Sequence, residues 1–362
     1  MQADFHWQLI TERPRQALID EWQQLSENNP DSCSSSFPIF SINSEIFLKG
    51  RKIFYAFAYK NEKMVCVIPF FIKSKIVNHL KINILQTINH DHIDTYVIAG
   101  QNLWDINELI QSFLSFLQYN LKGWDYFHAH NLICEARVSQ YNQIPLYDKK
   151  LAYFEVSNNT SAAGIISKKL LKNVTRLQNK IASNKGPLNL RCSVDEADFK
   201  SDLKVFIELE GSGWKSREKT SINCNSDVED FYKQTWAAFS AQGKSQIYIL
   251  YAGDVPIAGS LSFRHGRKVF LHKIAYLDSL SRYGAGSVLV KLIIESALTQ
   301  AGVDIICFNT YSDWVQRWHP LIYRLNSIEY FNNTPKGLLL NMAFGLYRSA
   351  SRLYKYLQQK PV

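Results

Sequence analysis

The segment Val269 to Thr310 reads VFLHKIAYLDSLSRYGAGSVLVKLIIESALTQAGVDIICFNT, and the chain can be interpreted outward from it. The β-rich residues 269–276 come first and are followed by a glycine-bearing turn at 281–286. Apolar residues then recur with helical spacing from Val288 to Ala297, and Gly302 predicts where the helix ends. The segment therefore predicts a strand, a turn, a helix and a second strand.

The turn before this helix predicts an anion site. The first amide N–H groups of a helix have no partners within it, and they and the helix dipole attract negative charge. The glycine spacing differs from the dinucleotide-binding fingerprint, and no Lys-Ser or Lys-Thr pair follows it as in a P-loop. We expect a phosphate ligand of another kind. The alternative is a structural turn whose glycines only satisfy positive φ.

Composition describes a globular protein with an acidic partner. The chain has 362 residues, of which 46% are hydrophobic, enough for the cores of two medium domains. Its net charge of +9 favours nucleic acid, a phosphorylated cofactor or an anionic membrane. The six cysteines lie far apart without zinc spacing, so we expect reduced, mostly structural thiols and no metal. The lack of a secretory pattern or an 18-residue apolar run favours the cytoplasm.

The first half of the chain repeats the element order of the second half. In the first half, a hairpin of two β-rich runs precedes a third strand, a helix and a strand that follows Gly123. In the second half, a comparable hairpin precedes the 269–310 segment, and Gly302 takes the place of Gly123. The first copy has only Gly100 before its helix. We therefore assign the cofactor to the second copy and acceptor binding to the cleft between the copies.

A basic amphipathic helix is predicted between the copies, from Ser167 to Gly186. Cations recur every four residues on one stripe, and apolar residues occupy the opposite stripe. The cations are Lys168, Lys172, Arg176 and Lys180. Their mutual repulsion favours a basic wall for a phosphorylated substrate, with Lys172 and Arg176 as binding residues. The alternative is a solvated surface helix.

Several segments together resemble one family, the CelD-like branch of GNAT acyltransferases, relatives of the two-lobed FemAB peptidoglycan-bridge enzymes. Ser281-x-x-Gly284-x-Gly286 resembles the family's pyrophosphate-binding turn, and His272 to Asp278 resembles the strand before it. The basic run 167–176, the segment Glu208 to Lys215 and the group Trp314 to Trp318 also resemble family segments. The likeness covers roughly residues 15 to 345. Two departures are Gly-Ala-Gly in place of Ser-Pro-Gly in the turn, and Asn309 where relatives often have Asp.

The resemblance implies an α/β fold of two tandem GNAT-like lobes, each a mixed twisted sheet flanked by helices. We divide the chain into an N-terminal lobe on the acceptor side, a connecting helix, an acyl-CoA-binding lobe and a basic amphipathic tail. The boundaries are 1–160, 161–186, 187–336 and 337–362.

The resemblance also implies transfer of an acyl group, with acetyl the first expectation, from acyl-CoA to an amine or hydroxyl. Cell-surface polysaccharide or conjugate synthesis is the expected setting. The expected acceptor is a small molecule or a sugar-linked group, and a nucleotide- or lipid-linked acceptor stays open. Expected cofactor-binding residues are Ile274, Ala275, Tyr276, Arg282, Gly284, Ala285, Gly286 and Ser287. Tyr276 or Tyr283 would protonate the departing thiolate, and Asp94 is the general-base candidate. Expected substrate-binding residues are Lys172, Arg176, Trp214, Lys215 and Lys273.

Two other functions stay open. One is an aminoacyl-tRNA-dependent transferase of the FemAB type, which the basic stripe would suit. The other is a non-catalytic adaptor on the same scaffold. The tail from Gly337 to Gln359 has basic and apolar positions. It would either complete a lobe with its final strand and helix or lie on the inner face of the membrane.

Overall fold

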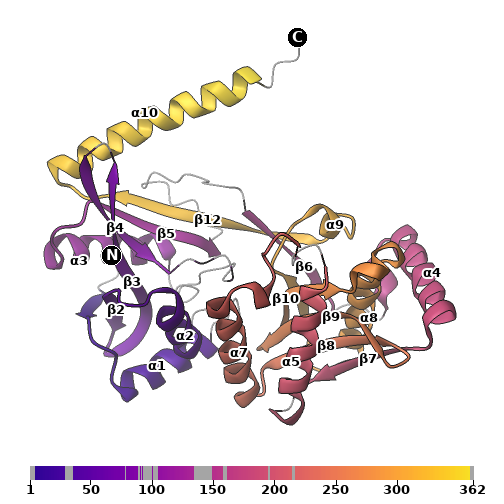
Figure 1. The fold of residues 1–362 in the computed structure, drawn as a ribbon. Coiled ribbons are helices and arrows are strands. Elements are labelled where there is room, and N and C mark those ends of the chain that lie inside the picture. Colours follow the sequence, from indigo (N-terminus) through magenta and orange to yellow (C-terminus); the bar gives the residue numbers. More distant parts are fainter. Residues whose placement is uncertain are drawn as a thin grey trace.

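The computed structural model describes residues 5–28, 36–77, 79–88, 90, 92, 100, 105–133, 149–157, 161–194, 196–213 and 217–358. Helices flank a mixed twisted sheet in two lobes that lie side by side, so the predicted fold class is confirmed (Figure 1). Among these residues, no helix combines the length and apolarity needed to cross a bilayer.

The strands divide equally between the halves of the chain. The first half contributes β1 (His6–Ile10), β2 (Ile53–Lys60), β3 (Lys63–Val77), β4 (Leu80–Thr87), β5 (Tyr126–Ile133) and β6 (Lys149–Glu155). The second contributes β7 (Leu188–Ser193), β8 (Ser245–Ala252), β9 (Val255–His265), β10 (Lys268–Tyr276), β11 (Ile305–Phe308) and β12 (Leu321–Phe331).

The principal helices of the first lobe are α1 (Gln16–Glu27), α2 (Phe37–Phe47) and α3 (Ile106–Asn120). Those that follow are α4 (Lys168–Lys185), α5 (Glu196–Gly211), α7 (Ser226–Ala241), α8 (Ala285–Thr299), α9 (Asp313–Gln316) and α10 (Pro335–Gln358). A short 3-10 helix, η5 (Asp278–Tyr283), leads into α8.

The strand order shows the internal duplication. It runs β1-β2-β3-β4-β5-β12-β6-β11-β10-β9-β8-β7 in one continuous sheet. β4 pairs parallel with β5, as β10 does with β11, and the other pairs are antiparallel. In each half, four antiparallel strands are therefore followed in the sheet by a fifth strand that pairs parallel with the fourth.

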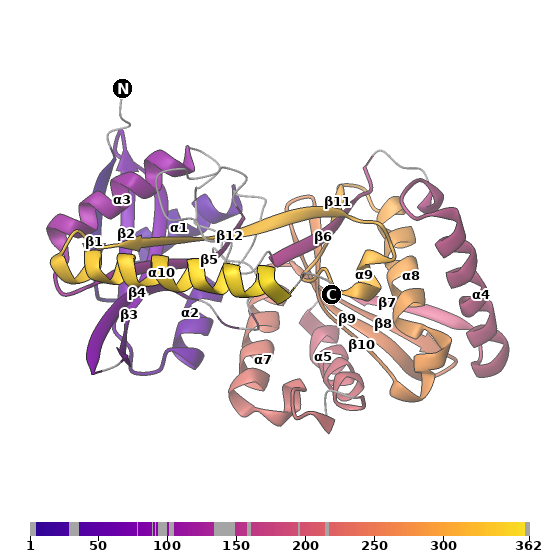
Figure 2. The same ribbon diagram turned by 90° about the horizontal axis from the view of Figure 1, so that it is seen from above.

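The last strand of each half is exchanged between the lobes. β6 is the last strand of the first half but pairs with β11 of the second half, and β12 is the last strand of the second half but pairs with β5 of the first half. The antiparallel pair β6–β12 then joins the two lobes (Figure 2). The lobes are therefore not contiguous in sequence, and β12 completes the first lobe although it lies within 187–336.

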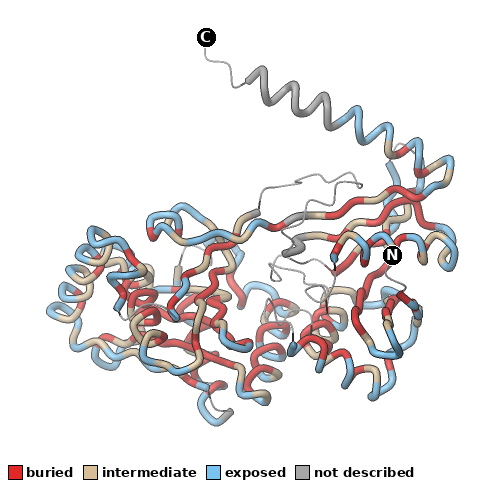
Figure 3. The backbone as a smooth tube through the Cα atoms, turned by 180° about the vertical axis from the view of Figure 1, so that it is seen from behind, coloured by how far each residue is buried: buried red, intermediate tan, exposed pale blue. Residues whose placement is uncertain are grey.

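Helices bury both faces of each lobe. In the first lobe α3 packs through Leu109 and Phe113 on one face, while α1 and α2 pack around Trp22 on the other. In the second lobe α8 and α4 cover one face, and α5 and α7 cover the opposite face. Buried positions accordingly follow the strands and the inward sides of the helices in both lobes (Figure 3).

The basic connecting helix forms as predicted. α4 begins after Ser167, whose hydroxyl accepts a hydrogen bond from the amide of Leu170. Val174 and Ile181 are buried against the second lobe, and Lys172 and Arg176 are exposed. The tail forms α10, which packs on the first lobe through Leu340 and an ion pair of Lys336 with Asp125, at 2.8 Å.

Candidate functional site

The two parallel strands at the centre of the second lobe diverge. β10 and β11 pair from Lys268 with Ile305 to Leu271 with Phe308, and the register ends there. A bulge follows in β10, which stays paired with β9 on its other side as far as Tyr276. Within the described part of the chain, the β10 edge at Ile274 and Tyr276 thus has no strand beside it, since its pairing with β11 has ended. Such an edge offers backbone donors and acceptors to an extended ligand.

The glycine turn lies at the end of this edge. Gly284 is the N-cap of α8 and has a left-handed φ of 64°. The positive φ requires glycine here, and a Cβ would also lie 2.9 Å from the end of the Leu177 side chain of α4, which would have to shift. Gly286 lies in the first turn of α8 without a positive φ, and its Cβ would lie 3.2 Å from the ring of Tyr276. Gly284 is therefore the residue whose backbone needs the conformational freedom of glycine. Gly286 has no side chain, so another group can approach the backbone of α8 closely there.

The start of α8 is suited to an anion, whereas the matching helix start in the first lobe is not. Gly284 supplies no capping side chain, and the first turn of α8 has no acidic residue. In α3, by contrast, the carboxylate of Asp105 accepts from the amides of Asn107 at 2.7 Å and Glu108 at 3.4 Å. An anionic side chain already occupies that helix start. This difference supports the assignment of the cofactor to the second lobe.

A cavity of about 360 Å³ opens at the turn. The edge of β10, the turn and the segment around α9 form its walls. Its lining residues are Ile274, Tyr276, Ser281, Gly284, Ala285, Gly286, Ser287, Trp314 and Arg317. Most of the predicted cofactor-binding residues therefore meet in one place. Arg317 adds an exposed cation, which lies within the noted segment Trp314 to Trp318 but was not predicted as a site residue.

Two predicted residues near the turn lie outside this lining. Arg282 is exposed on η5. The Tyr283 ring lies under the ammonium of Lys180, with 5.0 Å from Nζ to the ring centroid. Tyr276 is the tyrosine that the fold brings to the cavity, because β10 ends beside the first turn of α8.

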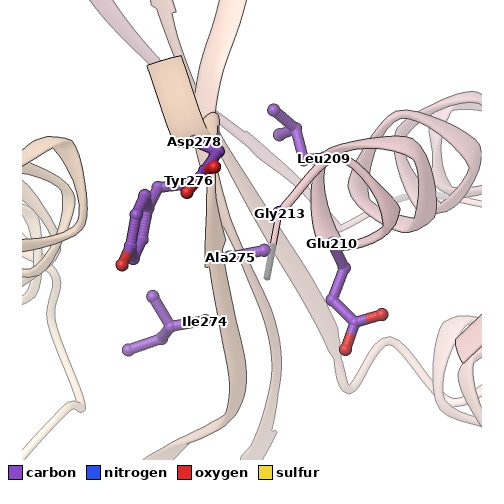
Figure 4. Close-up of a pocket in the computed structure, with 7 residues that line it drawn as sticks. All are labelled: Leu209, Glu210, Gly213, Ile274, Ala275, Tyr276 and Asp278. Atoms are coloured by element: carbon purple, nitrogen blue, oxygen red, sulfur yellow. The ribbon is translucent and has the colours of Figure 1, made fainter. Parts of the chain in front are cut away.

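The two faces of β10 carry different chemistry (Figure 4). Ile274 and Tyr276 point to one side, and Ala275 points toward α5, where Glu210 is located. Strand alternation puts Lys273 on the α5 side as well, with its Nζ 3.1 Å from Glu210 Oε1. Glu210 is 2% exposed and also accepts from the amide of Ile222 at 2.7 Å. The ammonium of Lys273 thus neutralises a buried carboxylate, away from the turn.

A hydrogen-bonded network crosses between the lobes where the strands diverge. The amide of Asn309 lies 2.5 Å from His272 Nδ1, and His272 Nε2 lies 3.3 Å from the Tyr232 hydroxyl. That hydroxyl lies 3.1 Å from Nδ1 of His92, which follows the first half's hairpin strands. Burial, then the charge of Lys273 and the proximity of His92, lower the His272 pKa to about 3. His272 is therefore neutral at pH 7, and an Asn309 donor places its proton on Nε2.

Three predicted residues, Asp94, Trp214 and Lys215, lie outside the described part of the chain. Lys172 and Arg176 lie on α4, whose Leu177 contacts the turn. Within the ranges that the structure describes, no group of three or more His, Cys, Asp or Glu side chains could hold a metal ion.

Comparisons with known proteins agree with this geometry. Residues 168–314 match the family model described as acetyltransferase (GNAT) domain. The fold is similar to the crystal structure of FemX, with 10% identity and a TM-score of 0.60 over 92% of this chain and 99% of that one. L-PGS from Bacillus licheniformis gives 12% identity and a TM-score of 0.53 over 92% and 97%. A search of curated proteins finds no significant match.

A third similar structure is a conserved protein of unknown function from Bacteroides thetaiotaomicron VPI-5482, with 10% identity and a TM-score of 0.55 over 88% and 97%. At such identities the structural likeness shows the fold alone. The family match lies within the second lobe and the α4 helix before it, so the likeness to an acetyltransferase (GNAT) domain concerns this part of the chain.

Proposed function

We propose that the second lobe transfers an acyl group from acyl-CoA to an amine or hydroxyl of an acceptor that enters between the lobes. The observation that carries the proposal is the coincidence of three features at one end of β10. These are the strand edge left by β11, the uncapped start of α8 and the 360 Å³ cavity that joins them. Gly286 would let a pyrophosphate approach the α8 backbone closely, because a side chain at this position would occupy part of the cavity.

A CoA thioester supplies an acyl carbonyl that is open to attack. The amides of Ala285 and Gly286 would bind the pyrophosphate with Arg317, and the backbone of Ile274 to Tyr276 would orient the chain and polarise the carbonyl. The acceptor nitrogen or oxygen forms the new bond to the carbonyl carbon while the C–S bond breaks. Tyr276 would return a proton to the sulfur, and a base, for which Asp94 remains our candidate, would remove one from the acceptor.

The finer identity is also part of the proposal. The resemblance favours the CelD-like branch, acetyl as the acyl group and an acceptor in cell-surface polysaccharide or conjugate synthesis. A cytoplasmic enzyme that contacts the inner face of the membrane through α10 would suit this work. The second candidate is an aminoacyl-tRNA-dependent transferase of the FemAB type, supported by the exposed stripe on α4. The third is a non-catalytic adaptor.

Calorimetry with acetyl-CoA tests the proposal. We expect Gly286→Val to abolish binding, because its side chain would meet Tyr276 and occupy the phosphate position. Loss of two charge-assisted bonds costs on the order of 3 kcal/mol, or over a hundredfold in affinity. Arg317→Gln should weaken binding about tenfold, whereas Arg282→Gln on the exposed η5 should change it less.

The matched control is Asp105→Ser, which alters the corresponding helix start in the first lobe but keeps a cap. Gly100→Val is unsuitable as a control, because a Cβ at Gly100 would overlap the carbonyl of Val65. Loss of binding in Asp105→Ser but not in Gly286→Val would place the cofactor in the first lobe. Native mass spectrometry with an acyl-CoA panel and charged tRNA separates the remaining functions, since folded protein that binds neither would be an adaptor.

A further inference from the structure

A second, larger cavity lies in the first lobe beneath α10, far along the sheet from the acyl-transfer site. It has a volume of about 450 Å³, within the usual range for small-molecule sites. Its floor is the sheet face formed by β3, β4, β5 and β12, and its roof is α10. Side chains from all five elements line it, among them Lys73, Ile84, Tyr126, Phe331 and Phe344.

The walls of this cavity are mainly apolar. Ile82, Tyr126, Phe331 and Leu340 form one buried cluster between the sheet and α10. Phe344 extends the roof, with its ring centroid 5.4 Å from Phe331 and 5.9 Å from Tyr126. An apolar chain placed between these layers would be shielded from water on both sides.

Cations gather along one edge of the cavity. Lys73 and Lys75 line it from β3, and Arg51 lies nearby with its guanidinium 5.4 Å from the Phe71 ring. None of the three forms an ion pair within the described residues. Burial, then the like charges of Lys75 and Arg51, lower the pKa of Lys73. A bound anion would relieve this repulsion.

The carboxylate in the lining lies on the opposite side of the cavity. In the sheet register Lys73 pairs with Ile84, Ile84 with Tyr126 and Tyr126 with Phe331. Glu329 is on the strand of Phe331, three strand spacings or about 14 Å from the lysine strand. The Tyr126 hydroxyl donates to this carboxylate, and His128 lies 3.9 Å from it. An anion beside Lys73 and Lys75 would therefore lie well away from Glu329.

Exposed apolar side chains continue the wall out to solvent. Val77 at the end of β3 is 50% exposed and Tyr347 on α10 is 74% exposed, and both line the cavity. The hairpin of β3 and β4 is in contact with the start of α10, because the Lys336 ammonium donates to the carbonyl of Lys81. A ligand with a long apolar part could extend across this rim.

We propose that the cavity beneath α10 binds a single-chain anionic amphiphile, with its chain along the apolar wall that Phe331 and Phe344 form and its anionic head at Lys73 and Lys75. An uncharged apolar ligand would make no use of the charges of Lys73 and Lys75, and a small free anion would leave the apolar walls of the cavity uncovered. The site is separate from the cofactor turn and does not depend on acyl transfer in the second lobe.

Calorimetry of the full chain with dodecyl phosphate below its micelle concentration tests the site. We expect saturable binding that weakens at least about tenfold in Lys73→Gln/Lys75→Gln, through loss of charge-assisted contacts. Lys200→Gln/Lys204→Gln, which removes two exposed cations from α5, should leave it unchanged. Phe344→Ala should weaken the binding of both dodecyl phosphate and neutral dodecyl maltoside. Acetyl-CoA affinity should stay the same in every variant, so this proposal and the acyltransferase proposal fail separately.

Three outcomes would overturn the site. Inorganic phosphate that binds as tightly as dodecyl phosphate would mean that the apolar walls play no part. Equal affinities in the wild type and the Lys73/Lys75 variant would remove the head-group position. The protein could instead associate only with anionic vesicles and lose this association in Leu339→Ser/Met342→Ser, which changes the exposed face of α10. The surface of α10 would then be a membrane-docking surface and not part of a ligand site. Circular dichroism melting of each variant confirms that it is folded.

Discussion

At the scale of single residues, His272 couples the site to the stability of the fold. The ring lies among Tyr232, Trp236 and Phe263, where a charged imidazolium is disfavoured. Its neutral form accepts from Asn309 and donates to Tyr232, so it orients groups at the strand divergence instead of serving as a strong base. Asn309 suits this arrangement, because a neutral amide donates to Nδ1 without drawing a second proton onto the ring.

The lowered pKa predicts a pH dependence of unfolding. The folded His272 takes up a proton near pH 3, whereas the ordinary pKa is 6.5. The unfolded chain therefore binds more protons between these values, and this part of the stability is lost as pH falls below about 6.5. The loss approaches about 1.4 kcal/mol per pH unit for one proton. His130, whose pKa burial and Lys73 lower to about 4, adds to it.

Urea unfolding at pH 7.5, 6 and 5 measures this effect. We expect the free energy of unfolding to fall over this range in the wild type and to fall less steeply in His272→Gln, which removes the His272 contribution and keeps that of His130. Parallel curves for the two proteins would mean that His272 is not held neutral in the folded state.

At the scale of elements, local pattern predicted the strand-turn-helix-strand segment well. Its strand, helix and final strand became β10, α8 and β11, and the hairpin at Lys60 to Lys63 turns through Asn61 and Glu62, both with positive φ. α2 was missed, because its sequence FPIFSINSEIF is apolar on most sides and gives little helical periodicity. Arg317 lies in a segment that was noted, but it was not predicted as a site residue, since only the packing of α9 brings it to a turn about 30 residues earlier.

The stripe on α4 gives the element-scale prediction. Lys172, Arg176 and Lys180 are exposed on the helix whose Leu177 contacts Gly284, so their field reaches the cofactor turn. We expect replacement of all three by Gln to weaken the binding of an anionic substrate and to make that binding less dependent on salt concentration. Lys122→Gln/Lys200→Gln/Lys204→Gln removes the same three charges from distant exposed positions and serves as the control. If both variants change the salt dependence equally, only net charge matters and the stripe is a solvated face.

At the scale of the whole molecule, the exchanged strands make the two lobes interdependent. Sequence reasoning found the duplication, because each copy repeats local signals such as Gly123 and Gly302, both with positive φ. It did not find the exchange, because the pairing of β12 with β5 joins residues nearly 200 positions apart, and no local pattern encodes that partner. The acceptor cleft that we propose would lie between lobes that hold each other's last strands, an arrangement that resists large hinge opening.

This architecture predicts that deletion of the chain's end damages its beginning. In a chain that ends at His319, β5 loses β12 and the buried side chains of Leu325, Ile328 and Phe331. Each contributes about 1.5 to 3 kcal/mol, so the total approaches the stability of a typical domain. Hydrogen exchange should then show lost protection in β5, with β8 and β9 still protected. A chain that ends at Asn333 keeps β12, including the bonds of Asn332 to Asp125 and Trp124, and should retain protection in β5. Loss of protection confined to the second lobe would instead mean that each lobe folds from its own contiguous half.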